Sequence, residues 1–196
     1  MTDSLAKLFG SAARVKLLRL FLFNPGHSFS IVHASQRSHT TLAEARREIQ
    51  LFYRAGLLRR SKRSRAVRFV LNGEYKYLAA LQALLLNAPA RGEDILRRLR
   101  PAGGIKFLTL AGIFVGNWDG SLDLLVVGDR VSETKLKRRV KRLEAELGKE
   151  VQYVLLATAE FSYRLNMSDK LLRDVFDYPH RIVLDRINSG LKNSLI

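Results

Sequence analysis

The sequence lacks cysteine entirely and contains no long apolar run. Without cysteine, the chain can form neither a disulfide scaffold nor a thiolate metal site, and it has no cysteine nucleophile. Its longest apolar stretches, Leu78–Leu86 and Phe107–Gly116, are too short to span a bilayer, and residues 1–10 lack the apolar core of a signal peptide. We therefore expect a cytoplasmic protein without a membrane partner.

Several catalytic and metal-binding motifs are also missing. The sequence contains no P-loop, no GxSxG motif and no HExxH motif. The four histidines, at positions 27, 33, 39 and 180, are not spaced as metal ligands. The sequence therefore contains no motif that predicts a metal site or a catalytic residue.

Acidic residues are few relative to basic ones. The chain has 34 Lys and Arg against 18 Asp and Glu, a formal net charge of +16. Residues 1–72 hold 14 basic and 3 acidic residues, whereas residues 73–196 hold 20 and 15. Such an excess indicates a polyanionic partner, either a nucleic acid or an anionic membrane surface. Because the excess is concentrated in the first third of the chain, we expect a binding module there.

The first 56 residues show a pattern of three helices. Apolar residues at helical spacing indicate a first helix, broken near Gly10 and ended by the turn-forming residues 24–26. A second, short helix is expected over Ile31–Gln36, followed by a polar turn. Thr41 and Glu44 form a capping-box pattern that predicts the start of the third helix, and Gly56 suits its C-terminal cap.

After Gly56 the apolar period changes from helical to alternating. Leu57–Arg60 and Val67–Leu71 read as two strands joined by a polar tip at residues 61–64, and Asn72-Gly73 closes the unit. Helices joined by a short turn can place the third one in the major groove of double-stranded DNA, with a basic hairpin along the backbone. The residues predicted to contact DNA from the turn and third helix are Ser38, Thr40, Thr41, Ala43, Glu44, Arg46, Arg47 and Gln50. Those predicted from the hairpin are Arg59, Arg60, Lys62, Arg63, Arg65 and Arg68.

Residues 5–72 resemble a winged helix-turn-helix domain of the bacterial and archaeal ArsR type. The resemblance rests on Leu5–Ser11, on Arg14–Leu18 and on Arg54–Leu58, where an "AGLL" ending precedes the basic hairpin. It implies DNA binding, but the unusual run Ser38–Thr41 departs from the family, so the bases that are read cannot be transferred. The alternatives are that the basic runs are only solvated faces, or that the unit binds a protein.

A linking helix is expected after this unit. Leu78, Leu81 and Leu85 share one face of the segment Glu74–Leu86, and Ala88–Gly92 reads as a domain boundary. With Tyr77 and Leu84, this face is more apolar than a spacer needs, so we expect the helix to contribute to a homodimer. The alternative is that the face packs on a domain of its own chain.

Strand-like and helix-like segments alternate beyond residue 89, as in an α/β or α+β domain with a mixed sheet. Strands are expected at Ile105–Val115, Leu122–Val127, Val151–Ala157 and Arg181–Asp185. Helices are expected at Glu93–Arg100, from about Ser132 or Thr134 to Gly148, and at Ser168–Asp177. Gly103-Gly104 reads as a loop.

Residues 105–185 resemble the minimal nucleotidyltransferase domain of the polymerase-beta-like fold. The resemblance rests on Gly112–Gly116 and Leu122–Asp129. With Tyr163–Met167 and Asp177–Pro179, it extends to a prokaryotic two-domain family that joins such a domain to a winged helix-turn-helix.

Active members of that fold need two carboxylates two residues apart on one strand, and a third on a neighbouring strand, to hold two metal ions. Here Asp123 holds the first position, Leu125 holds the second, and Val151–Ala157 contains no acid. The short segment after Gly116-Asn117 also leaves no room for the phosphate-binding helix. We therefore expect a degenerate domain with no catalytic residue, metal or cofactor. Asp123 is expected to accept from backbone donors, and Asp129 to shape the turn after Gly128; the alternative is a remnant nucleotide and Mg²⁺ site at Gly116, Asn117 and Asp123.

The sequence thus predicts an α+β protein with a winged helix-turn-helix at 1–72, a linking helix at 73–88 and a nucleotidyltransferase-like domain at 89–196. The expected function is sequence-specific DNA-binding transcriptional regulation, with the second domain serving dimerisation or the sensing of a small-molecule effector. Two alternatives stay open: an active nucleotidyltransferase directed to nucleic acid by its winged helix, and an antitoxin-like module with a protein partner.

Overall fold

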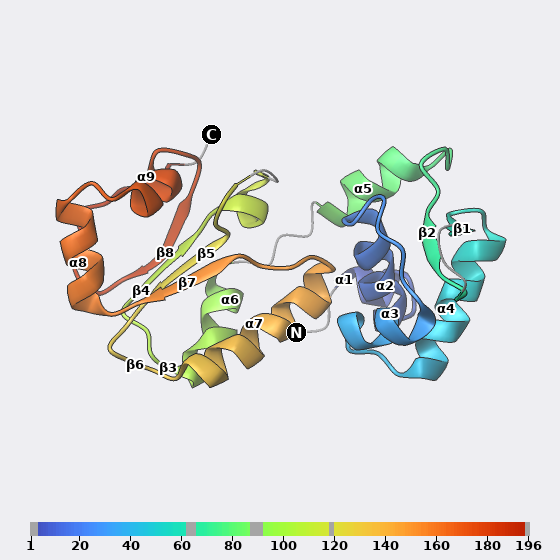
Figure 1. The fold of residues 1–196 in the computed structure, drawn as a ribbon, viewed down its shortest axis with the longest axis horizontal. Coiled ribbons are helices and arrows are strands. Elements are labelled where there is room, and N and C mark those ends of the chain that lie inside the picture. Colours follow the sequence, from blue (N-terminus) through green and yellow to red (C-terminus); the bar gives the residue numbers. More distant parts are fainter. Residues whose placement is uncertain (1–3, 62–65, 87–91, 118–119, 195–196) are drawn as a thin grey trace. The chain divides into compact units, whose positions relative to one another are not determined.

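A computed structural model describes residues 4–61, 66–86, 92–117 and 120–194 (Figure 1). The chain forms two compact units: residues 1–88 together with 142–150, and residues 89–141 together with 151–196. The sequence analysis assigned all of 89–196 to the second domain, whereas the contacts place 142–150 with the first unit. Among the described helices, none is both long and apolar enough to cross a membrane. The fold is α+β, with a mixed sheet.

The first unit is built from short helices and a hairpin. Its helices are α1 (Ser4–Leu8), α2 (Ala12–Leu22), α3 (Ile31–Ser38), α4 (Leu42–Arg54) and α5 (Leu78–Leu86), and its strands are β1 (Leu58–Arg60) and β2 (Phe69–Leu71). The expected break near Gly10 is present, with Gly10 at φ +67° between α1 and α2. Hydroxyls then cap the helices that follow, because Ser11 accepts from the Arg14 N–H and Ser30 from the His33 N–H, each at 3.1 Å.

The hairpin closes the first unit over the helices. β1 pairs antiparallel with β2, and Phe29, just before α3, forms an additional antiparallel bridge to Phe69. Phe69 and Leu71 turn into a core that also contains Ile49 and Phe52 of α4. The predicted strands are therefore present, each shorter at its N-terminal end than the sequence pattern indicated.

The linking helix α5 starts at Leu78 rather than at the predicted Glu74, because residues 72–77 form turns. Leu85 is buried in the core of the first unit, and Leu78 and Leu81 pack against the same core. The shared apolar face predicted for this helix is thus used within the chain. Tyr77, just before the helix, and Leu84 within it remain exposed.

A four-stranded sheet organises the second unit. The elements after α5 are α6 (Gly92–Leu99), the 3₁₀ turn η1 (Arg100–Ala102), β3 (Gly103–Gly104), β4 (Phe107–Leu110), the 3₁₀ turn η2 (Gly112–Val115), β5 (Leu124–Val127), β6 (Arg130–Val131), α7 (Glu133–Leu147), β7 (Tyr153–Leu156), α8 (Thr158–Asn166), α9 (Lys170–Phe176) and β8 (Arg181–Asp185). The sheet order is β7-β5-β4-β8, with β5 and β7 parallel and the other pairs antiparallel.

Helices lie on both faces of this sheet. Phe161 of α8 and Val175 of α9 share a core with Phe107 and Leu125. On the opposite face α6 approaches so closely that a Cβ at Gly92 would lie 2.6 Å from the Val183 side chain. The mixed sheet and the strand at Arg181–Asp185 agree with the sequence analysis.

Two expectations for the second unit were wrong, and one helix was missed. The strand predicted over Ile105–Val115 ends at Leu110, because Gly112 takes φ +50° and starts a 3₁₀ turn. Gly103-Gly104 is a short strand paired with β6, not a loop. Helix α8 was not predicted. Its N-cap residue, Ala157, supplies no capping side chain, so the helix carries no start signal in its own sequence.

Candidate nucleic-acid interface

Helix α4 has one buried face and one exposed face. Ala45, Ile49 and Phe52 are buried in the core, as their helical spacing predicted. The predicted contact residues Thr41, Ala43, Arg46, Arg47 and Gln50 are exposed, as are Leu42, Leu51, Tyr53 and Arg54. Three guanidinium groups and one carboxamide are therefore presented along a helix whose other side is buried in the core.

The start of α4 is fixed by the predicted capping box. The Thr41 hydroxyl oxygen accepts from the Glu44 N–H at 3.2 Å, and a Glu44 carboxylate oxygen accepts from the Thr41 N–H at 2.8 Å and from its hydroxyl at 2.7 Å. The hydrogen bond from the Thr41 N–H, followed by that from its hydroxyl, lowers the pKa of Glu44 below its usual value. The Glu44 carboxylate is consequently used to cap the N-terminus of α4.

The structure corrects the prediction for Ser38. Its side chain is 1% exposed, and its hydroxyl donates to the Ala34 carbonyl at 2.7 Å. A serine in the last turn of a helix commonly bonds the carbonyl four residues earlier, which removes it from the surface. Ser38 also lies 2.9 Å from the hydroxyl oxygen of the half-buried Thr40. The Ser38 hydroxyl is therefore used within the protein and is not on the exposed surface.

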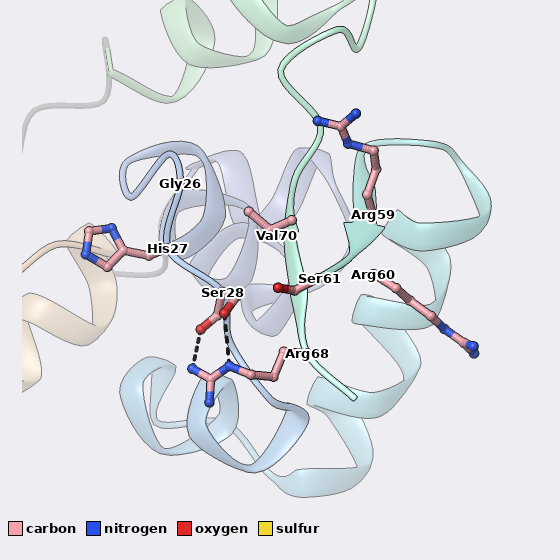
Figure 2. Close-up of a pocket in the computed structure, with 8 residues that line it drawn as sticks. All are labelled: Gly26, His27, Ser28, Arg59, Arg60, Ser61, Arg68 and Val70. Carbon is pink, nitrogen blue, oxygen red and sulfur yellow. Dashed lines mark hydrogen bonds between the residues drawn. The ribbon is translucent and has the colours of Figure 1, made fainter. Parts of the chain in front are cut away.

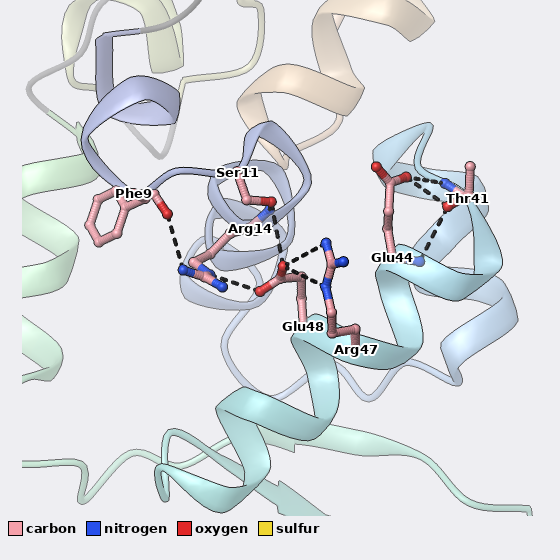
Figure 3. Close-up of polar contacts among 7 residues, drawn as sticks. All are labelled: Phe9, Ser11, Arg14, Thr41, Glu44, Arg47 and Glu48. Carbon is pink, nitrogen blue, oxygen red and sulfur yellow. Dashed lines mark hydrogen bonds and ion pairs between the residues drawn. The ribbon is translucent and has the colours of Figure 1, made fainter.

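A buried carboxylate that the sequence analysis missed anchors α4 to α2. Glu48 is 0% exposed, and one of its oxygens accepts from Arg14 Nε at 2.8 Å (Figure 3). Ser11 and Arg47 lie within 3.4 Å of the other oxygen. Arg14 also donates to the Phe9 carbonyl at 3.0 Å.

A sequence signal for this network was present. Glu48 stands three residues after Ala45 and four before Phe52, on the apolar face of α4. An acid at such a position requires a buried partner.

The described hairpin arginines differ in how firmly they are held. Arg59 and Arg60 are exposed: Arg59 lies 3.8 Å from Glu74, and the Arg60 guanidinium lies 5.5 Å from the centre of the Tyr53 ring. Arg68 is half-buried, and its Nε donates to the Ser28 hydroxyl at 2.9 Å while another guanidinium nitrogen donates to the Ser28 carbonyl. The remaining predicted hairpin contacts, Lys62, Arg63 and Arg65, lie outside the described residues.

In the second unit, Asp123 is used internally. It is 4% exposed, and its two carboxylate oxygens accept from the Ile113 N–H at 2.9 Å and from the Gln152 N–H at 2.8 Å. A Cβ added to Gly112 would lie 2.1 Å from one of these oxygens. The carboxylate therefore joins the start of β5 to η2 and to the residue before β7, as the backbone-donor interpretation predicted.

The other members of the proposed remnant nucleotide site lie nearby in the chain. Gly116 ends η2 in the left-handed region at φ +83°, and the Asn117 N–H donates to the Gly112 carbonyl at 2.9 Å. Leu125, at the position of the second carboxylate, is buried in the apolar core. Both Asp123 oxygens are used by backbone N–H groups. No cluster of three or more metal-ligating side chains occurs among the described residues.

Asp129 was expected to shape the turn after Gly128, but its carboxylate binds residues that are distant in the sequence. One carboxylate oxygen accepts from the Thr158 N–H at 2.8 Å, at the start of α8, and the other from Lys106 Nζ at 2.6 Å. The hydrogen bond from Lys106, with that from the Thr158 N–H, lowers the pKa of Asp129 to about 2. Asp129 thus supplies the cap that the sequence of α8 lacks.

Comparison of the chain with models of known protein families, with curated proteins and with solved structures gave no match.

Proposed function

We propose that this protein is a sequence-specific DNA-binding transcriptional regulator, with a winged helix-turn-helix as its contact module. The observation that carries the proposal is the exposed side of α4, where Arg46, Arg47 and Gln50 project from a helix anchored by Glu48 on its other side. The order of three helices followed by an antiparallel hairpin, with the Phe29 bridge at the hairpin's edge, supports the same proposal.

Each side chain has a role in this proposal. Arg46 and Arg47 suit guanine edges and Gln50 suits an adenine edge, because these groups can form paired hydrogen bonds in the major groove. Arg59 and Arg60 suit phosphates, since they are exposed cations on the neighbouring hairpin. Lys62, Arg63 and Arg65, at the tip of the same hairpin in the sequence, extend the proposed backbone contact.

The base-reading part is tested by selecting bound duplexes from a random pool and measuring affinities by fluorescence anisotropy. Arg46→Ala and Gln50→Ala should each lose about 1–3 kcal/mol on the selected sequence and little on random DNA. Arg173→Ala, which removes an exposed cation from the second unit, is the matched control. Equal losses on selected and random DNA would reduce α4 to a non-specific contact, and no losses would remove it from the interface.

The backbone part predicts a different signature. Arg59→Gln and Arg60→Gln, or Arg63 and Arg65 changed to Glu, should weaken binding at all sequences. The slope of log affinity against log salt should fall by about one for each lost phosphate contact. An unchanged slope would remove the hairpin from the proposal.

For the second unit we propose a degenerate nucleotidyltransferase-like domain that serves dimerisation or ligand sensing. The use of both Asp123 oxygens as backbone acceptors, and the apolar Leu125 two residues later, support this reading over nucleotidyl transfer. Incorporation of labelled nucleotide into the protein, a partner or a nucleic acid would overturn it.

We also propose a homodimer, since winged helices commonly bind paired half-sites. The surface that supports it is the outer side of the linking region, where Tyr77 is 53% and Leu84 43% exposed. The inner apolar face is already used within the first unit. Sedimentation should give a dimer of the 22.3 kDa chain at micromolar concentration, and Leu84→Glu should dissociate it. A monomer throughout would count against the proposal.

A further inference from the structure

The outer face of the β1–β2 sheet carries a hollow of about 740 Å³. The strand register explains its composition, because Arg59 pairs with Val70 and both point away from the core, whereas Phe69 points into it. His27 and Ser28, from the loop between α2 and α3, form a wall beside the strands. The hollow therefore lies on the hairpin sheet and includes none of the exposed α4 residues.

Arg68 is the fixed cation of this hollow. It donates two hydrogen bonds to Ser28, one to the hydroxyl oxygen and one to the carbonyl oxygen, so its position is set by neutral acceptors (Figure 2). Among the described residues, no carboxylate pairs with it. A guanidinium has more N–H donors than Ser28 uses, and they remain in a fixed planar fork. This half-buried group therefore retains a positive charge that an anion could neutralise.

Arg59 provides a second cation at a distance from Arg68. In Figure 2 Arg59 lies at one end of the hollow and Arg68 with Ser28 at the other, with Val70 between them. The partner of Arg59, Glu74, lies 3.8 Å away and both side chains are largely exposed, so the pair is weak. Arg60 points away from the Ser28–Arg68 pair in the same view, consistent with its position over Tyr53.

The described residues that line the hollow include no acid and supply guanidinium, hydroxyl and imidazole groups. Arginine forks and hydroxyls are the groups with which proteins bind phosphate. Val70, between the two cations, offers only an apolar surface. We infer that the hollow binds a ligand with two phosphate groups, one at Arg68 and Ser28 and the other at Arg59.

Two sources present this chemistry: successive phosphates of a nucleic-acid backbone, and a phosphorylated small molecule. The inference does not depend on α4 reading bases, because none of the α4 residues lines the hollow. It shares Arg59 with the proposed backbone contact and rests on that proposal only for the nucleic-acid source, and it goes further by assigning Arg68 and Ser28 to the same phosphate-binding hollow.

The test uses the full-length protein and two titrations. A nucleoside 3′,5′-bisphosphate, whose phosphates are spaced as along a nucleic-acid strand, is titrated by calorimetry, and a random duplex is titrated by anisotropy at several salt concentrations. The variants are Arg68→Gln, Arg59→Gln and, as the charge-matched control in the second unit, Arg173→Gln. Thermal melting verifies that each variant is folded. Arg59→Gln keeps the test decisive if the loss of Arg68 unfolds the hairpin, because Arg59 is exposed.

Two results support the inference and identify the source. In the first result, the bisphosphate binds saturably, and Arg68→Gln and Arg59→Gln weaken this binding about tenfold or more, whereas Arg173→Gln does not. If duplex affinity is unchanged in these variants, the ligand is a small molecule. In the second result, the bisphosphate does not bind, and only the two hollow variants bind duplex more weakly and with a smaller salt slope. This result identifies the nucleic-acid backbone as the ligand.

The inference is overturned if neither titration distinguishes the hollow variants from wild type, or if Arg173→Gln has the same effect as they do. Bisphosphate binding in a protein that binds no duplex would leave the hollow intact and contradict the proposed function instead. If Arg46→Ala alone weakens duplex binding and the bisphosphate does not bind, the result supports the proposed contact by α4 and contradicts phosphate binding by the hollow.

Discussion

Helix α4 in the first unit and the start of β5 in the second use their polar side chains in opposite ways. On α4, Arg46, Arg47 and Gln50 are exposed along one side. At β5, Asp123 is buried and both of its carboxylate oxygens accept from backbone N–H groups. The first arrangement leaves hydrogen-bonding groups for a partner, and the second uses them to hold the fold together.

This difference shows that a residue type typical of a catalytic motif can serve the fold instead. The sequence analysis makes Asp123 a candidate catalytic carboxylate, yet each of its oxygens accepts from a backbone N–H, that of Ile113 or that of Gln152. Within α4 itself, the buried Glu48 is also used internally, by Arg14 and by the exposed Arg47. Burial and the available donors, rather than residue type, separate contact residues from structural ones.

The largest effect is expected from Asp123→Ala. It removes the acceptor of two part-buried backbone N–H groups, which should cost roughly 3 kcal/mol of unfolding free energy. The only tryptophan, Trp118, belongs to the second unit by sequence, so its fluorescence during urea unfolding reports on that unit. The DNA binding proposed for the first unit should persist. A loss no larger than that of the exposed control Asp174→Ala would refute the structural role of Asp123.

A smaller effect is expected from Glu48→Gln. The substitution removes the buried charge while keeping the shape, and it leaves Arg14, whose side chain is 32% exposed, with a neutral partner. Because water can partly solvate Arg14, we expect about 2 kcal/mol, less than for a fully buried pair. A double-mutant cycle with Arg14→Gln measures the coupling energy between the two groups. Additive effects of the two changes would show that the ion pair does not anchor α4.

The smallest effect is expected from Asp129→Asn, and it depends on pH. The folded-state pKa of Asp129 is lowered to about 2 from 3.8, chiefly by Lys106. A lowered pKa means that the ionised carboxylate stabilises the folded state above about pH 4, and that this contribution disappears as pH falls toward 2. The difference in Tm between wild type and Asp129→Asn should therefore be small at pH 5 and vanish near pH 2. A constant difference over this range would exclude an ionic contribution, and Asp174→Asn is the exposed control.

Much of the fold could be predicted where the signal is local. The capping box at Thr41 and Glu44 and the helix end at Gly56 were predicted from neighbouring residues and are present. The strand Arg181–Asp185 also agrees with its prediction. Interactions between distant residues could not be predicted in this way. The start of α8 depends on Asp129, 29 residues before Thr158, and no pattern within α8 indicates that contact.

In the candidate site, too, local features could be predicted and contacts between distant residues could not. Exposure of Arg46 and Gln50 follows from helical periodicity, because the opposite positions Ala45, Ile49 and Phe52 are apolar. The burial of Ser38 does not follow from periodicity, and neither does the fixing of Arg68 by Ser28. The first depends on a helix that extends beyond its predicted end at Gln36, and the second on a contact between residues 40 positions apart.

The sequence alone determined the basic first third, the caps and period of α4, and the absence of a carboxylate at Leu125. These properties depend on residue identity and on spacings of a few positions, which the backbone converts directly into helix faces and turns. Only the tertiary structure decided that Asp123 and Glu48 are satisfied internally, and that Arg59 and Arg68 line one hollow. Those outcomes require residues far apart in the chain to meet, and the donors that surround a charged group decide whether it is left for a partner.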